Sequence, residues 1–147
     1  DRELVTRRGL LVGRVINEYQ ANFGRGDFLI RNPLGIDSNT GALAVDEYVR
    51  PGQTIQLHVR DSESADEDLR SLLANPRREH AAGALLFSCN GRGTRLFSDR
   101  NHDARMVSEA VAAAPSAGMF CAGEIGPVGP HNYLHGHTAA IGLIRST

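Results

Sequence analysis

The stretch TIQLHVRD, residues 54–61, decides the predicted fold. Apolar and polar side chains alternate along it, so that Ile55, Leu57 and Val59 lie on one face of a strand and His58 on the other. This alternation is typical of a half-buried strand in an antiparallel sheet. We therefore expect the face of Ile55, Leu57 and Val59 to be buried.

Three apolar segments before this strand also predict strands, at residues 9–16, 28–32 and 42–45. Turn-forming residues separate the last two at DSNTG, residues 37–41, and a further turn is expected at 49–53. The first part of the chain therefore predicts hairpins.

Two helices are predicted. Residues 64–67 have the form of a capping box, leucines recur behind them at helical spacing, and Pro76 would end this helix. A second helix would begin at a cap on Asp99 or Asn101 and end at Pro115. Its apolar stripe consists of Met106, Val107, Ala110, Val111 and Ala114.

Three further apolar segments predict strands at residues 83–90, 117–126 and 135–145. The first two lack polar alternation, so we expect both of their faces to be covered. The predicted order is four strands, helix, strand, helix and two strands. This order indicates an α+β fold over residues 1–147 as one domain, with a largely antiparallel or mixed sheet and two main helices packed on it.

Composition limits the classes of function. The net charge is −1 and every basic residue is an arginine, so neither a polyanion partner such as nucleic acid nor a Schiff-base lysine is predicted. No signal peptide or long apolar run is visible, and we expect a cytoplasmic protein with no membrane partner. The charged start, DRELVTRRGL, indicates a piece of a longer protein that lacks an N-terminal partner domain.

Glu124 lies in FCAGEIGPVGPHNYLHGHT, residues 120–138, behind an apolar run. A carboxylate in such a place needs a partner, which leaves open a structural ion pair with an arginine, a nest of backbone amides, a ligand ammonium or a metal. His131, His135 and His137 with Cys121 would be the metal ligands, but their spacing matches no familiar zinc site. We therefore predict no metal and no cofactor.

Arg92 lies in FSCNGRGTRLF, residues 87–97, between two glycines at the end of an apolar strand. The segment is either a surface turn or a loop whose amides and guanidinium hold an anion. Cys89 is a candidate nucleophile, although cysteines in apolar strands are usually inert. His102 is interpreted as an ordinary surface or cap residue.

Together, GALLFSCNGRGTRLF, Asn101-His102-Asp103 and GMFCAGEIGPVG with LHGHT resemble the C-terminal domain of FIST proteins. GDFLIRN and residues 52–60 fit the same pattern, so the resemblance covers nearly the whole chain. It implies a sensory domain of intracellular signal transduction that binds a small polar metabolite, such as an amino acid, beside a FIST N-terminal domain.

On this resemblance, Arg92 would bind the carboxylate of an amino acid and Glu124 its ammonium group. The remaining contacts would come from Asn90, Gly91, Gly123, His135 and Thr138. We expect both motifs to face one cavity and Glu124 to be ionised and paired. An enzyme that uses Glu124 and His135 as acid and base, or Cys89 as nucleophile, is one alternative. A purely structural or partner-binding half of a larger protein is the other.

Overall fold

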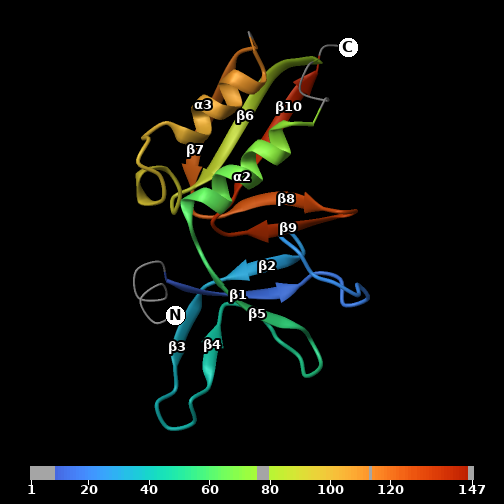
Figure 1. The fold of residues 1–147 in the computed structure, drawn as a ribbon, viewed down its shortest axis with the longest axis vertical. Helices are drawn as coiled ribbons and strands as arrows, with labels where there is room; N and C mark the ends of the chain where they lie inside the picture. The colour runs from blue at the N-terminus through green and yellow to red at the C-terminus, as the bar shows by residue number, and fades with distance from the viewer. Residues whose placement is uncertain (1–8, 76–79, 113, 146–147) are drawn as a thin grey trace. The chain divides into compact units, whose positions relative to one another are not determined.

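The computed structural model of the protein describes residues 9–75, 80–112 and 114–145. Within these ranges the chain forms two α-helices and ten strands in antiparallel and mixed sheets (Figure 1). The predicted α+β class is confirmed. The contacts divide the chain into two compact units, Asp1–Arg60 and Asp61–Thr147, which are described separately below. That the whole chain acts as one domain stays a prediction.

The first unit contains a three-stranded antiparallel sheet of order β2-β1-β5. Its strands are β1 (Leu10–Val15), β2 (Phe28–Arg31) and β5 (Ile55–Val59), at the predicted places. A separate hairpin joins β3 (Pro33–Ile36) to β4 (Leu43–Val45). The returning strand and its turn at 37–41 were predicted, whereas the strand that begins at Pro33 was not.

The face of β5 that was expected to be buried is the more exposed one. Leu57 is 61% exposed and Ile55 53%, while His58 on the other face is half-buried. Gly13, on the neighbouring strand β1, explains why the His58 face is the more buried one. Gly13 has no side chain, and the His58 ring fills the space, so that a Cβ at Gly13 would lie 2.5 Å from His58 Nε2. The edge position of β5 leaves its apolar side chains without a second flanking strand.

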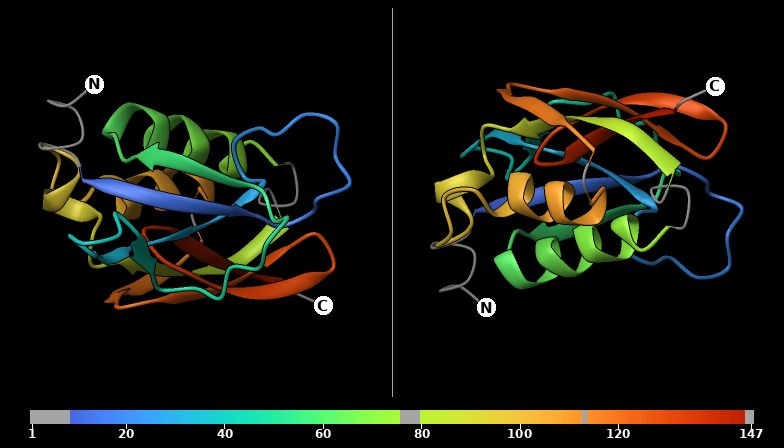
Figure 2. Two further views of the ribbon diagram at one scale, coloured as in Figure 1. Left: turned by 90° about the horizontal axis from the view of Figure 1, so that it is seen from below. Right: turned by 90° about the horizontal axis from the view of Figure 1, so that it is seen from above.

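The second unit is built on a mixed sheet of order β10-β6-β7. The central strand β6 (Ala81–Cys89) pairs antiparallel with β10 (Ala139–Arg145) and parallel with β7 (Ser116–Cys121). The two views of Figure 2 show α2 (Ser62–Leu73) and α3 (His102–Ala110) on the same side of β6. Both helices were predicted at these places.

The helix caps differ in detail from the prediction. α2 begins two residues before the expected capping box, because the Asp61 side chain accepts a hydrogen bond from Ser64 N at 2.9 Å. Asn101 is the N-cap residue of α3, as expected, but its side chain makes no capping hydrogen bond. The expected end of the first helix at Pro76 lies outside the described residues.

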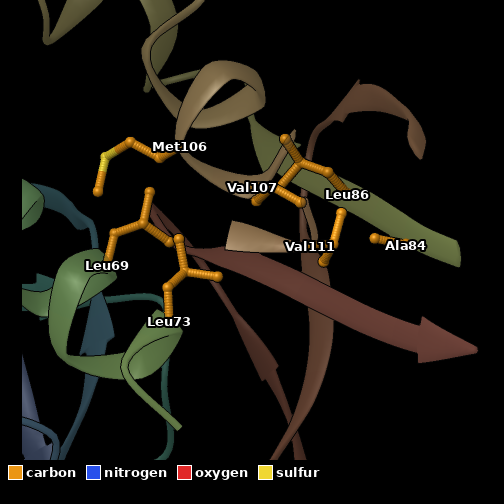
Figure 3. Close-up of a cluster of buried hydrophobic side chains, with 7 residues drawn as sticks. All are labelled: Leu69, Leu73, Ala84, Leu86, Met106, Val107 and Val111. Carbon is orange, nitrogen blue, oxygen red and sulfur yellow. The ribbon is translucent and has the colours of Figure 1, made fainter. Parts of the chain in front are cut away.

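The core of this unit lies between the two helices and β6 (Figure 3). Amphipathic helices bury their apolar stripe against such a sheet. The buried side chains are those of Leu69, Leu73, Ala84, Leu86, Met106, Val107 and Val111. They include most of the apolar positions that were read from the helical spacing.

Only one face of the sheet is covered in this way. Leu85, between buried Ala84 and Leu86, is 39% exposed, and Met119 on β7 is 64% exposed. The prediction that both faces of β6 and β7 are covered is therefore wrong, since β7 is an edge strand and the helices pack on one side. None of the described helices is both long and apolar enough to cross a membrane.

The chain then forms a two-stranded hairpin that was not predicted. It consists of β8 (Glu124–Val128) and β9 (His131–His135), joined at Gly129, whose φ is +59°. The predicted strand at 117–126 breaks at a bend over residues 122–123, so Glu124 begins β8. The predicted last strand at 135–145 likewise starts only at Ala139.

Candidate functional site

The loop after β6 turns the Arg92 side chain into the protein. Arg92 N donates to Cys89 O at 2.8 Å, and Gly93 follows with a φ of +55°, a conformation that favours glycine. The short 3₁₀ helix η2 (Gly93–Arg95) begins there. Because of this turn, the guanidinium is buried and also lies over the Phe97 ring, 5.2 Å from its centre.

Arg92 and Asp103 form a two-point ion pair. Arg92 Nε donates to Asp103 Oδ2 at 2.7 Å and Nη2 donates to Oδ1 at 2.9 Å. Both side chains are only 6% exposed. A planar guanidinium matches a carboxylate in this geometry, and such pairs are among the stronger hydrogen bonds of proteins. The pair holds the loop after β6 against the first turn of α3.

Two more side chains complete the contacts of the Asp103 carboxylate. Ser88 Oγ donates to Oδ2 at 2.8 Å, and His102 Nδ1 lies 2.9 Å from Oδ1. Burial acts to raise the pKa of Asp103, but the hydrogen bonds from Arg92 and His102, with the charge of Arg92, lower it below the ordinary value of 3.8. Asp103 is therefore a carboxylate with two partners on each oxygen.

His102 links this network to α2. Its Nε2 lies 2.9 Å from Asp66 Oδ1, and its ring stacks on Phe97 with the two ring centres 3.6 Å apart. Its interpretation as an ordinary surface or cap residue is wrong, because the first turn of α3 faces both β6 and α2. Local sequence shows neither neighbour. The only available signal was Asn101-His102-Asp103 itself, which forms part of the family resemblance.

A cavity of about 220 Å³ opens between α3 and β7, beside this network. Ser88 and Asp103, both buried, supply polar atoms on its walls. Leu86, Val107 and β7 residues 116–120 supply most of the remaining surface. Arg100, Asn101, Ala104 and Gly93 complete the lining. Mostly apolar walls with a few placed polar groups are typical of small-molecule sites.

Glu124 lies in a second polar cluster, at the start of the β8–β9 hairpin. It is 2% exposed, and its Oε2 accepts a hydrogen bond from Thr138 Oγ1 at 3.0 Å. The other oxygen, Oε1, is buried and has no hydrogen-bond partner. Among the described residues, no arginine or histidine lies within ion-pair distance of this carboxylate. One oxygen of Glu124 therefore has the chemistry to accept a hydrogen bond from a ligand.

His135 faces Glu124 across the hairpin. The two residues are partners in the β8–β9 register, and His135 Nε2 lies 3.0 Å from Gly126 O. Gly123 packs on this turn, where a Cβ would lie 3.2 Å from Leu134 Cδ1. The hairpin thus brings Gly123, Glu124 and His135 close to Thr138.

The predicted site residues form two groups at one end of the sheet. Asn90 N donates to Cys121 O at 2.7 Å, which joins the loop containing Asn90, Gly91 and Arg92 to the segment before Glu124. Cys89 N donates to Thr138 O at 3.0 Å. Neither group lines the cavity between α3 and β7, which only Gly93 of the loop reaches. That Arg92 and Glu124 share one cavity stays a prediction.

The structure also brings the two cysteines together. Cys89 and Cys121 are register partners on β6 and β7, although the sequence places them on separate strands. Both thiols are free, with Cys89 buried and its Sγ 3.5 Å from Gly91 N. In the described part of the chain, no three or more His, Cys, Asp or Glu side chains gather as metal ligands would.

The chain is similar to one protein family and to several mycobacterial proteins. The family model named FIST C domain matches residues 1–127. An uncharacterized protein of Mycobacterium tuberculosis is 48% identical over 146 residues, which cover 97% of this chain and 38% of the relative. An uncharacterized protein of Mycobacterium bovis is 46% identical over the same shares. The chain thus spans 38% of the length of these relatives. No solved structure matches it at a significant level.

Proposed function

Since the chain belongs to the FIST C domain family, generally a sensory domain of signalling proteins, we propose that it binds a small polar metabolite as the input of a sensor. Amino acids are the first candidates, as the family resemblance implies. The bound molecule would occupy the cavity between α3 and β7. The longer protein would convert its presence into a signal.

The cavity is the observation that carries this proposal. Its volume of about 220 Å³ suits a metabolite rather than a macromolecule. The buried network of Ser88, Asp103 and Arg92 is held by paired hydrogen bonds, so the polar groups beside the cavity are fixed before a ligand arrives. Such preorganisation lowers the entropic cost of binding.

The chemistry of the network favours binding over catalysis. Ser88 is the buried hydroxyl beside the cavity, and its hydrogen-bond partner Asp103 has a lowered pKa. A carboxylate of low pKa is a weak general base for a serine hydroxyl. The enzyme alternative based on Glu124 and His135, or on Cys89, would be supported by steady turnover of a metabolite that the protein binds.

The site residues predicted from the sequence do not line the cavity, so this proposal gives them roles other than direct contact with a ligand in it. Arg92 holds Asp103 in place instead of meeting the ligand. Glu124 and Thr138 form a second contact point at the end of the sheet, with Oε1 as the open acceptor. Asn90, Gly91, Gly123 and His135 stay in the proposal as further ligand contacts at that end of the sheet.

A metabolite thermal-shift screen tests the proposed function with two matched variants. Ala104 is an exposed residue of α3 that lines the cavity, whereas Ser108 is exposed on the same helix and does not. We expect at least one polar metabolite to raise the melting temperature of the native chain. Ala104→Leu should abolish that shift by filling the cavity, and Ser108→Leu should keep it.

Two results would contradict this proposal. A broad screen without any stabilising metabolite would remove the sensor function for this chain. A metabolite that stabilises the Ala104→Leu variant as well as the native chain would place binding outside the cavity. In that case Glu124→Gln, tested with the same metabolite, shows whether the second contact point is the site.

A further inference from the structure

The cavity contains one acidic side chain, and its hydrogen-bonding capacity is occupied. Asp103 Oδ2 accepts from Ser88 Oγ and Arg92 Nε, while Oδ1 lies within hydrogen-bond distance of Arg92 Nη2 and His102 Nδ1. A carboxylate offers about four acceptor positions, and all four are taken. The negative charge is also matched by the buried guanidinium. A ligand ammonium would therefore enter the cavity without a counter-charge or a free carboxylate acceptor.

Ser88 offers a neutral acceptor instead. Its hydroxyl proton points to Asp103, so the lone pairs of Oγ stay available beside the cavity. A ligand hydroxyl can donate one hydrogen bond to them without bringing a charge into a buried place. Burying a charge without a partner costs far more than burying a hydrogen-bonded hydroxyl.

Arg100 supplies the cationic group of the cavity. It is exposed, it lines the cavity, and in the described part of the chain no carboxylate lies within ion-pair distance of it. Asn101, next to it in the lining, has a side chain that makes no helix-capping hydrogen bond. Guanidinium groups bind carboxylates with charge-assisted hydrogen bonds. Arg100 can therefore bind the anionic end of a ligand.

The remaining walls are mostly apolar, and the exposed Ser116 of β7 adds one more hydroxyl. Val107 and Leu86 lie on one side, and Phe120 of β7, which is more than half exposed, lies on the other. An aliphatic or aromatic side chain on the ligand would cover the exposed part of Phe120. Removal of such apolar area from water favours binding.

We propose that the cavity selects a small 2-hydroxy monocarboxylate with an apolar side chain over the amino acid of the same shape. The inference rests on the proposed function, and it replaces amino acids, the first candidates there, with hydroxy acids as the ligand class. The carboxylate binds Arg100, the hydroxyl donates to Ser88 Oγ, and the side chain lies against Val107 and Phe120. Arg92 does not line the cavity. Its ion pair occupies acceptor positions of the Asp103 carboxylate, so that none is left for a ligand ammonium group.

Isothermal titration calorimetry with three molecules that share one carbon skeleton tests the proposed ligand class. They are L-2-hydroxyisocaproate, L-leucine and 4-methylpentanoate, which differ only in the hydroxyl, ammonium or hydrogen at carbon 2. We expect the hydroxy acid to bind about tenfold or more tighter than leucine, because the ammonium loses water without a counter-charge. It should also bind several-fold tighter than 4-methylpentanoate, which lacks the donor to Ser88.

Three variants test which side chains of the protein contact the ligand. Arg100→Gln should weaken the hydroxy acid and 4-methylpentanoate by a similar factor, about tenfold or more, because both lose the same ion pair. Arg95→Gln removes an exposed arginine of η2 that does not line the cavity and should change neither affinity. Ser88→Ala should bring the two affinities together, provided that its circular dichroism matches that of the native chain.

The outcomes separate this inference from the proposed function. Leucine that binds as tightly as the hydroxy acid, or an unchanged affinity in Arg100→Gln, overturns the ligand class and leaves the sensor function standing. Failure of all three molecules to bind also overturns the class. If another metabolite from the thermal-shift screen still binds and Ala104→Leu blocks it, the proposed function survives that failure.

Discussion

At the scale of residues, one ion pair decides how the loop after β6 meets α3. Arg92 and Asp103 are 11 residues apart in the sequence and are both buried. Their pairing satisfies two charges that would otherwise be costly inside the protein. It also makes the arginine of the NGRG motif the support of a buried carboxylate.

The first prediction concerns Asp103→Asn. The substitution leaves the Arg92 charge buried without its counter-charge, and the free energy of unfolding should fall by about 3–5 kcal/mol at neutral pH. Urea unfolding of both proteins measures the loss. Asp99→Asn, which removes an exposed partner of Arg105, is the control and should have a much smaller effect.

The same pair predicts a pH dependence. The pKa of Asp103 is lowered by folding, so its stabilisation is fully present above the unfolded pKa, near 3.8, and is lost as pH falls through the folded value. The difference in stability between the native chain and Asp103→Asn should therefore shrink below about pH 4. A difference that stays constant from pH 7 to pH 3 would show that the charge of Asp103 does not stabilise the fold.

At the scale of elements, two glycines on the strands that flank β6 have opposite surroundings. A Cβ at Gly118 on β7 would lie 2.3 Å from the backbone oxygen of Leu86. At Gly142 on β10, the nearest atom to an added Cβ would be Leu85 Cβ at 3.8 Å, an ordinary contact. Close approach of β7 to β6 at the cavity wall therefore depends on the absence of a side chain at Gly118.

Alanine substitutions at these two positions test that dependence. Gly118→Ala should lower the free energy of unfolding by about 1–3 kcal/mol, the usual cost of overpacking, because a backbone oxygen cannot move aside without shifting a strand. Gly142→Ala should stay within about 0.5 kcal/mol of the native chain. Thermal and urea unfolding measure both, and equal effects at the two positions would rule out the steric explanation.

At the scale of the whole molecule, the residues proposed to bind a ligand all belong to the second of the two compact units. The core of α2, α3 and β6 lies entirely within Asp61–Thr147, and so do the cavity and the Glu124 cluster. The unit Asp1–Arg60 has its own sheet, β2-β1-β5, and none of its described residues, 9–60, is part of the cavity lining. Ligand binding in the cavity should therefore not require residues 1–60.

A truncated chain of residues 61–147 tests this division. Circular dichroism should show the helices α2 and α3, and the fragment should respond in the thermal-shift assay to the same metabolite as the full chain. A folded fragment that has lost the response would show that residues 1–60 take part in binding. An unfolded fragment would show that the second unit needs the first for its stability.

Local patterns in the sequence determined the type of most elements. Alternation and apolar runs predicted β1, β2 and β5, and helical spacing with nearby caps predicted α2 and α3, because these signals depend on residues a few positions apart. Only the tertiary structure decided which face of β5 is buried, through Gly13 on the neighbouring strand. It also decided that Arg92 pairs with Asp103 and that Glu124 meets Thr138, because strand register and helix packing select partners that are distant in the sequence.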